Sequence, residues 1–482
     1  MLTTLAAPAF AATWRIEDGD ITVKAGETEG TNKVSQGTNK DVVDTDTIIT
    51  NSDKDTASSH TVTIDAGNDK VEVTLDNVNI KADSGSALTS NGDVTLTLKG
   101  ENHLTGGNGD TYGGDGITSS GSLTISGGTV TATGGNNTGS DGSGGSGIYS
   151  VSGSVTISGG TVNATGGEGS KNNSTSGGSG IYSDSGDVTI SGGTVNANGG
   201  NGGTISGGDG ICSSGGVTIS SGSTVTANGG NGEDGSGGRG ITSNGGVTVS
   251  GGTVNAKGGS GKNGNGGDGI RSFNPVAISG GTVNANGGNS DYSNGGDGIR
   301  SLDHVAISGG TVKSNGGSGN LSGGNGIISY DIDLSGSLEL TAKAGSPNGK
   351  ALSRVGSELD LNTIKDKLDP GAKVTATDAD GKVIQQVSIP RPVEPEEPSS
   401  SSDGGSATPS APASFLPGLT VTDKDGQRIS YTSTQSGNTL TVCVGRFTAS
   451  LRASLAALRQ LRAEGIETIT FQTILCSTTL SV

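Results

Sequence analysis

The chain has 482 residues, of which 92 are glycine and only 2% are aromatic. It carries 47 acidic and 29 basic residues, which gives a formal net charge of -18. This charge argues against nucleic acid as a partner, because phosphates need a basic surface, and it disfavours an anionic membrane for the same reason. We find no apolar run long enough to span a bilayer. With only three cysteines, no disulfide framework is expected.

The first eleven residues, in the stretch MLTTLAAPAFAA, resemble the second half of a secretory signal. A short apolar segment leads to Ala9-Phe10-Ala11, a small-residue pattern typical of cleavage sites, although no basic segment precedes it. We therefore interpret residues 1–11 as a signal-peptide remnant and expect a secreted or extracellular cell-surface protein. Residues 12–84 follow with the strand-like runs HTVTIDAG, KVEVTL and NVNIKA, and we expect irregular first coils and an N-terminal cap there.

Residues 85–344 contain a repeat in which three short alternating runs recur in fixed order, as in GIYSDSGDVTISGGTVNANGG from Gly180 to Gly200. A valine after each SGG-type turn recurs in steps of 29 to 33 residues from Val130 to Val312. Alternation sends successive side chains to opposite faces of a strand. The first-run isoleucines share one register and are Ile117, Ile148, Ile181, Ile211, Ile241, Ile270, Ile299 and Ile327. Paired apolar residues, such as Val188/Ile190 and Val195/Ala197, follow in the second and third runs.

Three strands per turn, each paired with its copy one turn further on, make a parallel β-helix with an apolar interior. We therefore predict an all-β solenoid of nine or more coils, which stack at roughly 4.8 Å. Glycine suits the corners, because it tolerates a positive φ and close backbone approach. Disorder, the alternative reading of a glycine-rich chain, would not keep three apolar ladders in phase.

The remaining sequence predicts a cap, a linker and a second module. Residues 345–390 are expected to cap the solenoid with a short helix and a hairpin, and the Pro/Ser-rich residues 391–418 to form a linker. Residues 419–482 alternate as strands around FTASLRASLAALRQLRAEG, so we expect a small α+β module. Its helix would place Leu451, Leu455, Leu458 and Leu461 on one face and end at Gly465. Cys443 and Cys476 are either paired or ordinary buried thiols.

The succession GENHLTGG, GGDGI and GSLTISGGTVTATGG resembles the carbohydrate-binding β-helix domain of secreted and surface proteins of clostridia-like bacteria. The resemblance covers about Gly85 to Ala344, with weaker support back to Thr61. It implies a right-handed parallel β-helix similar to pectate lyases, which binds plant polysaccharides such as cellulose and polygalacturonate and holds Ca²⁺ without required catalysis. The chain departs from an ideal glycan binder in having few aromatic residues.

The residue after each first-run isoleucine should face outward, and stacked coils should align these residues. This outward column consists of Thr118, Tyr149, Tyr182, Cys212, Thr242, Arg271 and Arg300. Aromatic rings suit the C–H face of a sugar, and arginine forks a uronate carboxylate. We therefore predict carbohydrate binding by Tyr149, Tyr182, Arg271 and Arg300. The alternative is a solvated sheet face with arbitrary polar residues.

Aspartates recur in the glycine-rich loops before the isoleucines, at Asp115, Asp209, Asp268 and Asp297. Neighbouring carboxylates repel unless a cation, or Arg239, Arg271 and Arg300, offsets them. Ca²⁺ prefers oxygen ligands of this kind, so Asp209, Asp268 and Asp297 are candidate calcium ligands. Favourable Asp-Gly turn chemistry is the alternative.

No catalytic motif appears, and His60, His103 and His304 are scattered. We therefore expect a polysaccharide-binding solenoid that is not an enzyme, with a plant cell-wall or acidic glycan as its partner. The alternatives are a structural stalk or adhesin, a pectate-lyase-like enzyme, and an ice-binding surface. The last rests on a ladder of outward threonines, with Thr161 and Thr194 among them, followed two residues on by asparagines such as Asn163 and Asn196.

Overall fold

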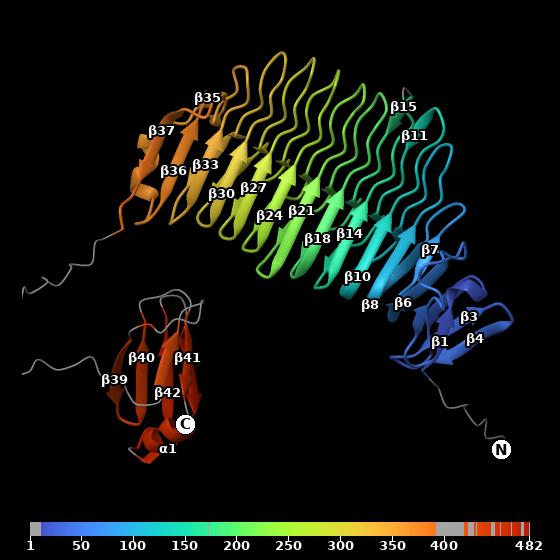
Figure 1. Ribbon diagram of the computed structural model, residues 1–482, viewed down its shortest axis with the longest axis horizontal. Helices are drawn as coiled ribbons and strands as arrows, with labels where there is room; N and C mark the ends of the chain where they lie inside the picture. Colours follow the sequence, from blue (N-terminus) through green and yellow to red (C-terminus); the bar gives the residue numbers. More distant parts are fainter. Residues whose placement is uncertain are drawn as a thin grey trace, which may run out of the picture. The chain divides into compact units, whose positions relative to one another are not determined.

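A computed structural model describes residues 11–171, 173–391, 419–422, 429, 431–444, 449–453, 455–463, 465–473 and 477–481. The chain divides into two compact units, Met1–Val393 and Glu394–Val482. The first unit is a β-solenoid of about 13 turns, whose coils stand side by side in a curved row (Figure 1). This architecture confirms the predicted parallel β-helix and its three strands per turn.

The regular coils contribute one strand to each of three parallel columns. The first column contains β9 (Ile117–Ser119), β12 (Ile148–Ser150), β16 (Ile181–Ser183), β19 (Ile211–Ser213), β22 (Ile241–Ser243), β25 (Ile270–Ser272), β28 (Ile299–Ser301), β31 (Ile327–Ser329) and β34 (Leu352–Arg354). The second contains β13 (Val155–Ile157), β17 (Val188–Ile190), β20 (Val217–Ile219), β23 (Val247–Val249), β26 (Val276–Ile278), β29 (His304–Ile307) and β32 (Asp331–Leu334). The third contains β14 (Thr161–Thr165), β18 (Gly193–Asn198), β21 (Ser223–Asn228), β24 (Thr253–Lys257), β27 (Thr282–Asn286), β30 (Thr311–Asn315), β33 (Glu339–Lys343) and β36 (Lys373–Thr377).

The first coils are built from longer strands that turn corners without interruption. They are β6 (Val62–Asp76), β8 (Leu88–Thr105) and β10 (Leu123–Thr133), with the short β7 (Asn79–Lys81) beside β8. The N-terminal end carries β1 (Thr13–Arg15), the 3-10 turn η1 (Ile16–Asp18), β2 (Ile21–Ala25), β3 (Asn32–Gln36), β4 (Asn39–Asp44) and β5 (Ile48–Thr50). Strand β2 pairs with β6 on one edge and with β3 on the other. The antiparallel β2–β3–β4 meander thus continues from the exposed end of the first coil, where an uncapped edge would invite aggregation.

The apolar ladders meet inside the solenoid as predicted. Ile181 pairs in register with Ile211, and Val188 pairs with Val217. All four side chains are fully buried, and they belong to one continuous core that runs through the first unit. Burying each such side chain contributes roughly 1.5–3 kcal/mol. The stack is therefore held by a β-branched interior together with backbone hydrogen bonds between coils.

Glycine is needed for two different reasons. At the turn between the second and third columns, Gly160 and Gly193 adopt a φ of 76°, in the left-handed region that favours glycine. The loops between the third column and the next first-column strand use glycine for close packing instead. They form a regular row of long hairpins beside the strands (Figure 1). Their glycines make a second hydrogen-bonded structure that we did not anticipate from the sequence.

We call this structure the glycine ribbon. Each member donates its N–H to the carbonyl oxygen of the member before it, at 2.7–2.9 Å, alternating between the outgoing and returning arms of the loops. Its members are Gly85, Gly107, Gly114, Gly135, Gly145, Gly167, Gly178, Gly200, Gly208, Gly230, Gly238, Gly259, Gly267, Gly288, Gly296, Gly317, Gly324 and Gly345. A Cβ on Gly200 would lie 2.0 Å from the carbonyl oxygen of Gly167. No side chain fits at such a distance, so the loops that appeared variable are ordered at their bases.

The C-terminal end of the solenoid is capped by β35 (Ser357–Glu358), the 3-10 helix η2 (Leu361–Lys367) and β37 (Val383–Ser388). Asp360 begins η2 and accepts a hydrogen bond from the backbone N–H of Asn362 at 2.9 Å. Strand β37 folds back antiparallel on β36, so the last coil ends in a hairpin. The predicted short helix and hairpin are both present.

The second unit contains β38 (Leu419–Thr422), β39 (Thr432–Ser436), β40 (Thr439–Cys443), β41 (Ser450–Ala453), α1 (Leu455–Ala463), β42 (Thr468–Gln472) and β43 (Ser477–Ser481). The expected mixture of strands and one helix is present. Leu451, however, lies in β41, which pairs with β38, so its predicted place on the helix was wrong. Gly465 has a φ of 83° and lies just beyond α1, as expected of a C-terminal cap. Cys443 is a free thiol, and Cys476 lies outside the described residues.

Candidate functional site

The outward column forms as one continuous line of side chains along the first column of strands. Its neighbours pair in register from Thr118 through Tyr149, Tyr182, Cys212 and Thr242 to Arg271 and Arg300. The structure extends the line to Thr89 at one end and to Ile328 at the other. Every inward neighbour is a buried isoleucine, leucine or serine. The candidate glycan-binding residues therefore share one face of the solenoid.

The two tyrosines stack on each other. The ring centroids of Tyr149 and Tyr182 are 5.2 Å apart, with an angle of 14° between the planes. The Tyr182 hydroxyl donates a hydrogen bond of 2.7 Å to Asp184 Oδ1. One face of each ring is consequently turned to the other ring rather than to solvent. Burial raises the pKa of both phenols, and the nearby Asp184 carboxylate adds to this effect.

Cys212 lies between the aromatic and basic ends of the outward column. Burial, followed by the negative charge of Asp209, raises the pKa of its thiol to about 12. The thiol therefore stays protonated at neutral pH and is a weak nucleophile. It separates the two halves of the column without adding a reactive group.

The basic end of the outward column holds polar atoms without partners. Among the residues that the structure describes, four buried side-chain nitrogen or oxygen atoms lack a hydrogen-bond partner. Three of these atoms lie on consecutive coils of the column, namely Thr242 Oγ1, Arg271 Nε and Arg300 Nε. The fourth is Ser90 Oγ in the interior. Leaving a buried polar group unsatisfied costs about 1–3 kcal/mol, so this concentration singles out one stretch of the surface.

The aspartate register lies beside this basic end. Asp209 Oδ2 is 3.9 Å from Arg239 Nη1, Asp268 Oδ2 is 3.8 Å from Arg271 Nη1, and Asp297 Oδ2 is 3.2 Å from Arg300 Nη1. The Asp268 and Asp297 side chains are only 9% and 6% exposed. The three predicted metal ligands are therefore nearly buried and each faces a guanidinium. Arginine thus offsets the negative charges of the stacked carboxylates. This is one of the two possibilities that the sequence raised, the other being a bound cation.

The other oxygen of each carboxylate is also engaged. Asp209 Oδ1 accepts the backbone N–H of Arg239 at 2.7 Å, Asp268 Oδ1 accepts that of Asp297 at 2.8 Å, and Asp297 Oδ1 accepts that of Asn325 at 2.6 Å. Each aspartate thus fastens its own coil to the next. Burial, and then the charge of Asp297, raises the pKa of Asp268. A donor set already bound to N–H groups and guanidiniums does not fit Ca²⁺, which needs six or more free oxygen ligands.

A second exposed feature borders Arg271 and Arg300, and the sequence interpretation missed it. The residues that follow the buried serine of β25, β28 and β31 are Phe273, Leu302 and Tyr330, which we call the apolar corner. Phe273 and Tyr330 are 44% and 66% exposed, whereas Leu302 is half-buried. The Arg271 guanidinium carbon lies 5.2 Å from the centre of the Phe273 ring. Comparing IRSF, IRSL and IISY at this position would have revealed the pattern.

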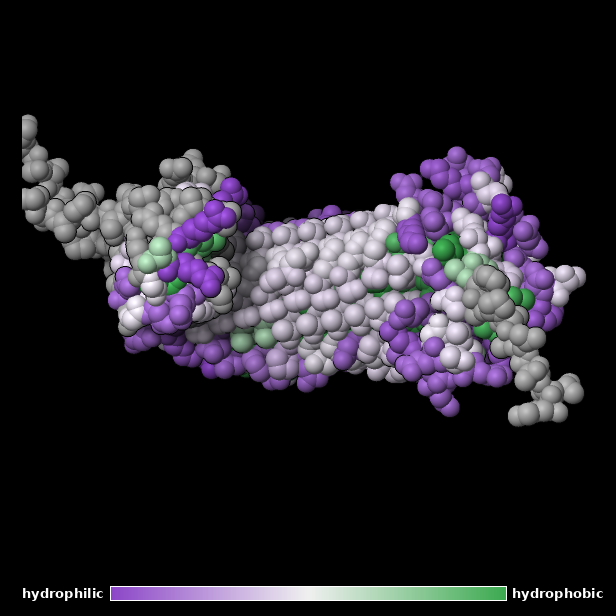
Figure 2. Space-filling view, turned by 90° about the horizontal axis from the view of Figure 1, so that it is seen from below, coloured by the Kyte–Doolittle hydropathy of each residue, from purple (hydrophilic) through white to green (hydrophobic). Residues whose placement is uncertain are grey.

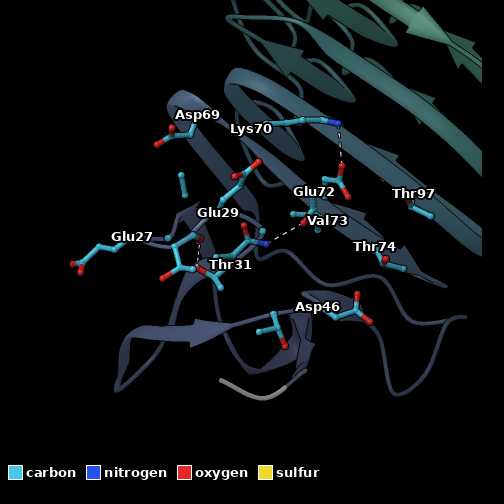
Figure 3. Close-up of a pocket in the computed structure, with 16 residues that line it drawn as sticks. Glu27, Glu29, Thr31, Asp46, Asp69, Lys70, Glu72, Val73, Thr74 and Thr97 are labelled. Carbon is cyan, nitrogen blue, oxygen red and sulfur yellow. Dashed lines mark hydrogen bonds and ion pairs between the residues drawn. The ribbon is translucent and has the colours of Figure 1, made fainter. Parts of the chain in front are cut away.

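A pocket lies elsewhere, between the β2–β3 turn and the second half of β6 (Figure 3). Its volume is about 850 Å³, and its lining residues include Glu27, Glu29, Asp46, Asp69 and Glu72. Lys70 Nζ contacts Glu72 Oε1 at 2.9 Å, as the dashed line in Figure 3 shows. The pocket is strongly acidic, so an acidic glycan would be repelled. The described residues contain no group of three His, Cys, Asp or Glu side chains suited to a metal ion.

The threonine and asparagine ladders run along the third column. Thr161 pairs with Thr194 in register, and Asn163 pairs with Asn196. The Asn196 side-chain amide donates a hydrogen bond of 2.8 Å to Asn163 Oδ1, so these amides are partly satisfied along the stack. Figure 2 shows one side of the molecule, where the middle of the stack is pale, of intermediate hydropathy, and arranged in regular rows. This regularity follows from strand register.

Comparisons with known proteins agree with the fold. Searches of curated proteins and of solved structures gave no match. No helix among the described residues is long and apolar enough to cross a membrane. A family model described as a beta helix repeat matches residues 123–147 and 276–299. Each matched segment runs from a second-column position through the glycine-rich loop toward the next coil, so the chain is similar to beta helix repeat proteins over these two segments.

Proposed function

We propose that the solenoid binds an acidic polysaccharide of plant cell-wall type along the outward column, without catalysis, as a secreted or cell-surface protein. Carboxylate groups of the polymer would be held by Arg271 and Arg300. The observation that carries the proposal is the pair of arginines that stand in register on neighbouring coils, Arg271 and Arg300, whose side chains are 23% and 37% exposed. A uronate carboxylate would accept charge-assisted hydrogen bonds from the accessible part of these guanidiniums.

Net electrostatic attraction contributes little to this proposal. The chain is acidic overall, and Arg271 and Arg300 already face Asp268 and Asp297. Recognition would therefore depend on directional hydrogen bonds from the guanidiniums rather than on a broad positive field. For that reason we expect geometry-sensitive binding, in which lysine does not replace arginine.

The stacked tyrosines would contribute at the other end of the column. Because Tyr149 and Tyr182 cover one face of each other, they would offer ring edges and the remaining outer faces to a polymer. Both side chains are half-buried, so little of their conformational freedom would be lost on binding. We therefore assign them a supporting role and the arginines the main one.

The test is retention on insoluble polygalacturonate, compared with cellulose. Arg271→Lys combined with Arg300→Lys keeps the positive charges and removes the planar guanidiniums. This double variant should weaken uronate retention about 10- to 100-fold. Lys313→Ala removes one positive charge from an exposed position of β30 and should leave retention unchanged. Equal retention of wild type and the double variant would overturn the proposal.

Two other functions predict different results in the same assays. A lyase would release unsaturated uronate products from pectate, which we do not expect, because in both Asp268 and Asp297 one oxygen accepts a backbone N–H and the other faces an arginine. A stalk or adhesin would retain no polysaccharide at all. The stalk is favoured by the uninterrupted interior and by the division into two compact units.

A further inference from the structure

We infer that the apolar corner (Phe273, Leu302 and Tyr330) is the platform for the sugar rings of the same acidic polymer, which lies along the solenoid axis across at least three coils. This inference rests on the proposed function and deepens it. It assigns ring contacts to residues that stand beside the arginines rather than to the stacked tyrosines.

The register of the strands places the two features side by side. Arg271, Ser272 and Phe273 are consecutive, as are Arg300, Ser301 and Leu302, and the serines are buried. Phe273 and Leu302 lie one residue past the ends of β25 and β28, and continued alternation to that residue brings them out on the same face as the arginines, roughly 6.6 Å away. This separation is comparable with the width of one uronate residue from its carboxylate to the opposite edge of the ring.

The chemistry of the two columns is complementary to a uronate polymer and to few other ligands. One column offers two partly exposed guanidiniums, and the other offers exposed apolar surface. The coils of β25 and β28 repeat this pair of features at about 4.8 Å, and the next coil has Ile328 in place of the arginine. A polymer whose residues each carry one carboxylate and one apolar ring face would match both columns when it runs across the coils. A chain running along a single strand would meet only one coil.

Of the two further carboxylates at the corner, one is paired with an arginine, and the other contacts a histidine, which offsets its charge only when protonated. Asp331 Oδ1 contacts Arg354 Nε at 3.0 Å, and Asp303 Oδ1 is 3.4 Å from His304 Nδ1. The Arg271 guanidinium faces the Phe273 ring, which holds both groups at the boundary between the columns. Phe273 thereby positions Arg271 as well as offering its own exposed surface.

The experiment measures binding of uronic-acid oligomers of increasing length by calorimetry. Phe273→Ser combined with Tyr330→Ser should weaken binding of long oligomers about 5- to 30-fold. Tyr292→Ser is the matched control, because Tyr292 is 61% exposed but lies in a loop tip away from the column, and it should have no effect. In wild type, affinity should rise with oligomer length until the oligomer spans three coils.

The outcomes separate this inference from the proposed function. If wild type and the Arg271→Lys/Arg300→Lys variant bind equally, or neither binds, the proposed function fails and the inference fails with it. If the arginine variant weakens binding but the Phe273→Ser/Tyr330→Ser variant binds like the Tyr292→Ser control, the inference alone is overturned. Analytical ultracentrifugation supplies a further test: a wild-type dimer that becomes a monomer in the Phe273→Ser/Tyr330→Ser variant would show that a second copy covers the corner.

Discussion

Substituting one glycine of the glycine ribbon tests whether the loops are held by backbone packing. In Gly200→Ala, the new Cβ would lie 2.0 Å from the carbonyl oxygen and 2.6 Å from the carbonyl carbon of Gly167. Ordinary contacts of this kind begin near 3.4 Å, so Gly200 and Gly167, on the outgoing arms of successive loops, must move apart by more than 1 Å. This movement would break the 2.8 Å bonds from Gly200 N–H to Gly178 and from Gly208 N–H to Gly200.

The magnitude follows from those two bonds. At about 0.5–1.5 kcal/mol each, their loss costs about 1–3 kcal/mol. Alanine also reduces the conformational entropy of the unfolded chain. This stabilises the folded state by about 0.4–1 kcal/mol wherever alanine can adopt the native backbone conformation. Gly159→Ala is therefore the control, because a Cβ there meets nothing within 4 Å. The difference between the two variants isolates the steric cost.

The assay is urea unfolding combined with hydrogen exchange, since a solenoid can open locally without unfolding throughout. We expect Gly200→Ala to be less stable than Gly159→Ala by about 1–3 kcal/mol. Amides of residues 199–208 should exchange faster, while those of the distant third-column strands keep their protection. Equal stability and equal exchange of the two variants would refute the role of close backbone packing.

Three further predictions concern the core, the buried carboxylate and calcium. Ile211→Asp should place an unpaired charge in the interior and increase hydrogen exchange of that coil, whereas Thr218→Asp on the exposed side of the same coil should not. Burial raises the Asp268 pKa from its ordinary value of 3.8 to about 6, so between these values the folded state keeps a proton that the unfolded state has lost. The free energy of unfolding of wild type relative to Asp268→Asn, measured in urea, should therefore fall as the pH rises through this window. A difference that does not change with pH would contradict the assignment. Calcium should not shift the melting temperature of wild type relative to Asp268→Asn/Asp297→Asn, because one oxygen of each carboxylate accepts a backbone N–H and the other faces an arginine. A calcium-dependent shift that is lost in the double variant would restore the calcium site predicted from the sequence.

The sequence predicted the parts of the fold that side-chain pattern determines. Phase-locked apolar residues such as Ile181 and Ile211 can pair in only one register, because a slip of one residue would turn them outward. The adjacency of Tyr149 and Tyr182 followed from the same register. Their ring stacking did not, since it depends on side-chain torsions that repeat spacing leaves open.

Other features were missed because the deciding contacts are made by backbone or by distant strands. The glycine ribbon has no side chains, so its order is invisible to hydrophobic periodicity. Leu451 fits a helical spacing, but pairing of β41 with β38 outweighs that local preference. The role of Asp268 as a link between coils depends on the backbone N–H of Asp297, a contact that no residue pattern specifies.

The glycine ribbon also allows the loops to change in length and sequence while the coils stay the same. Two ribbon members of one loop, Gly107 and Gly114, are 7 residues apart, whereas Gly167 and Gly178 are 11 apart. Each pair nevertheless joins the same hydrogen-bonded chain, and the strands on either side keep their pairing. Insertions beyond the glycines would therefore leave the rest of the solenoid undisturbed. Such loop tips can diversify by mutation, or accept grafted peptides, as independent sites on a fixed frame.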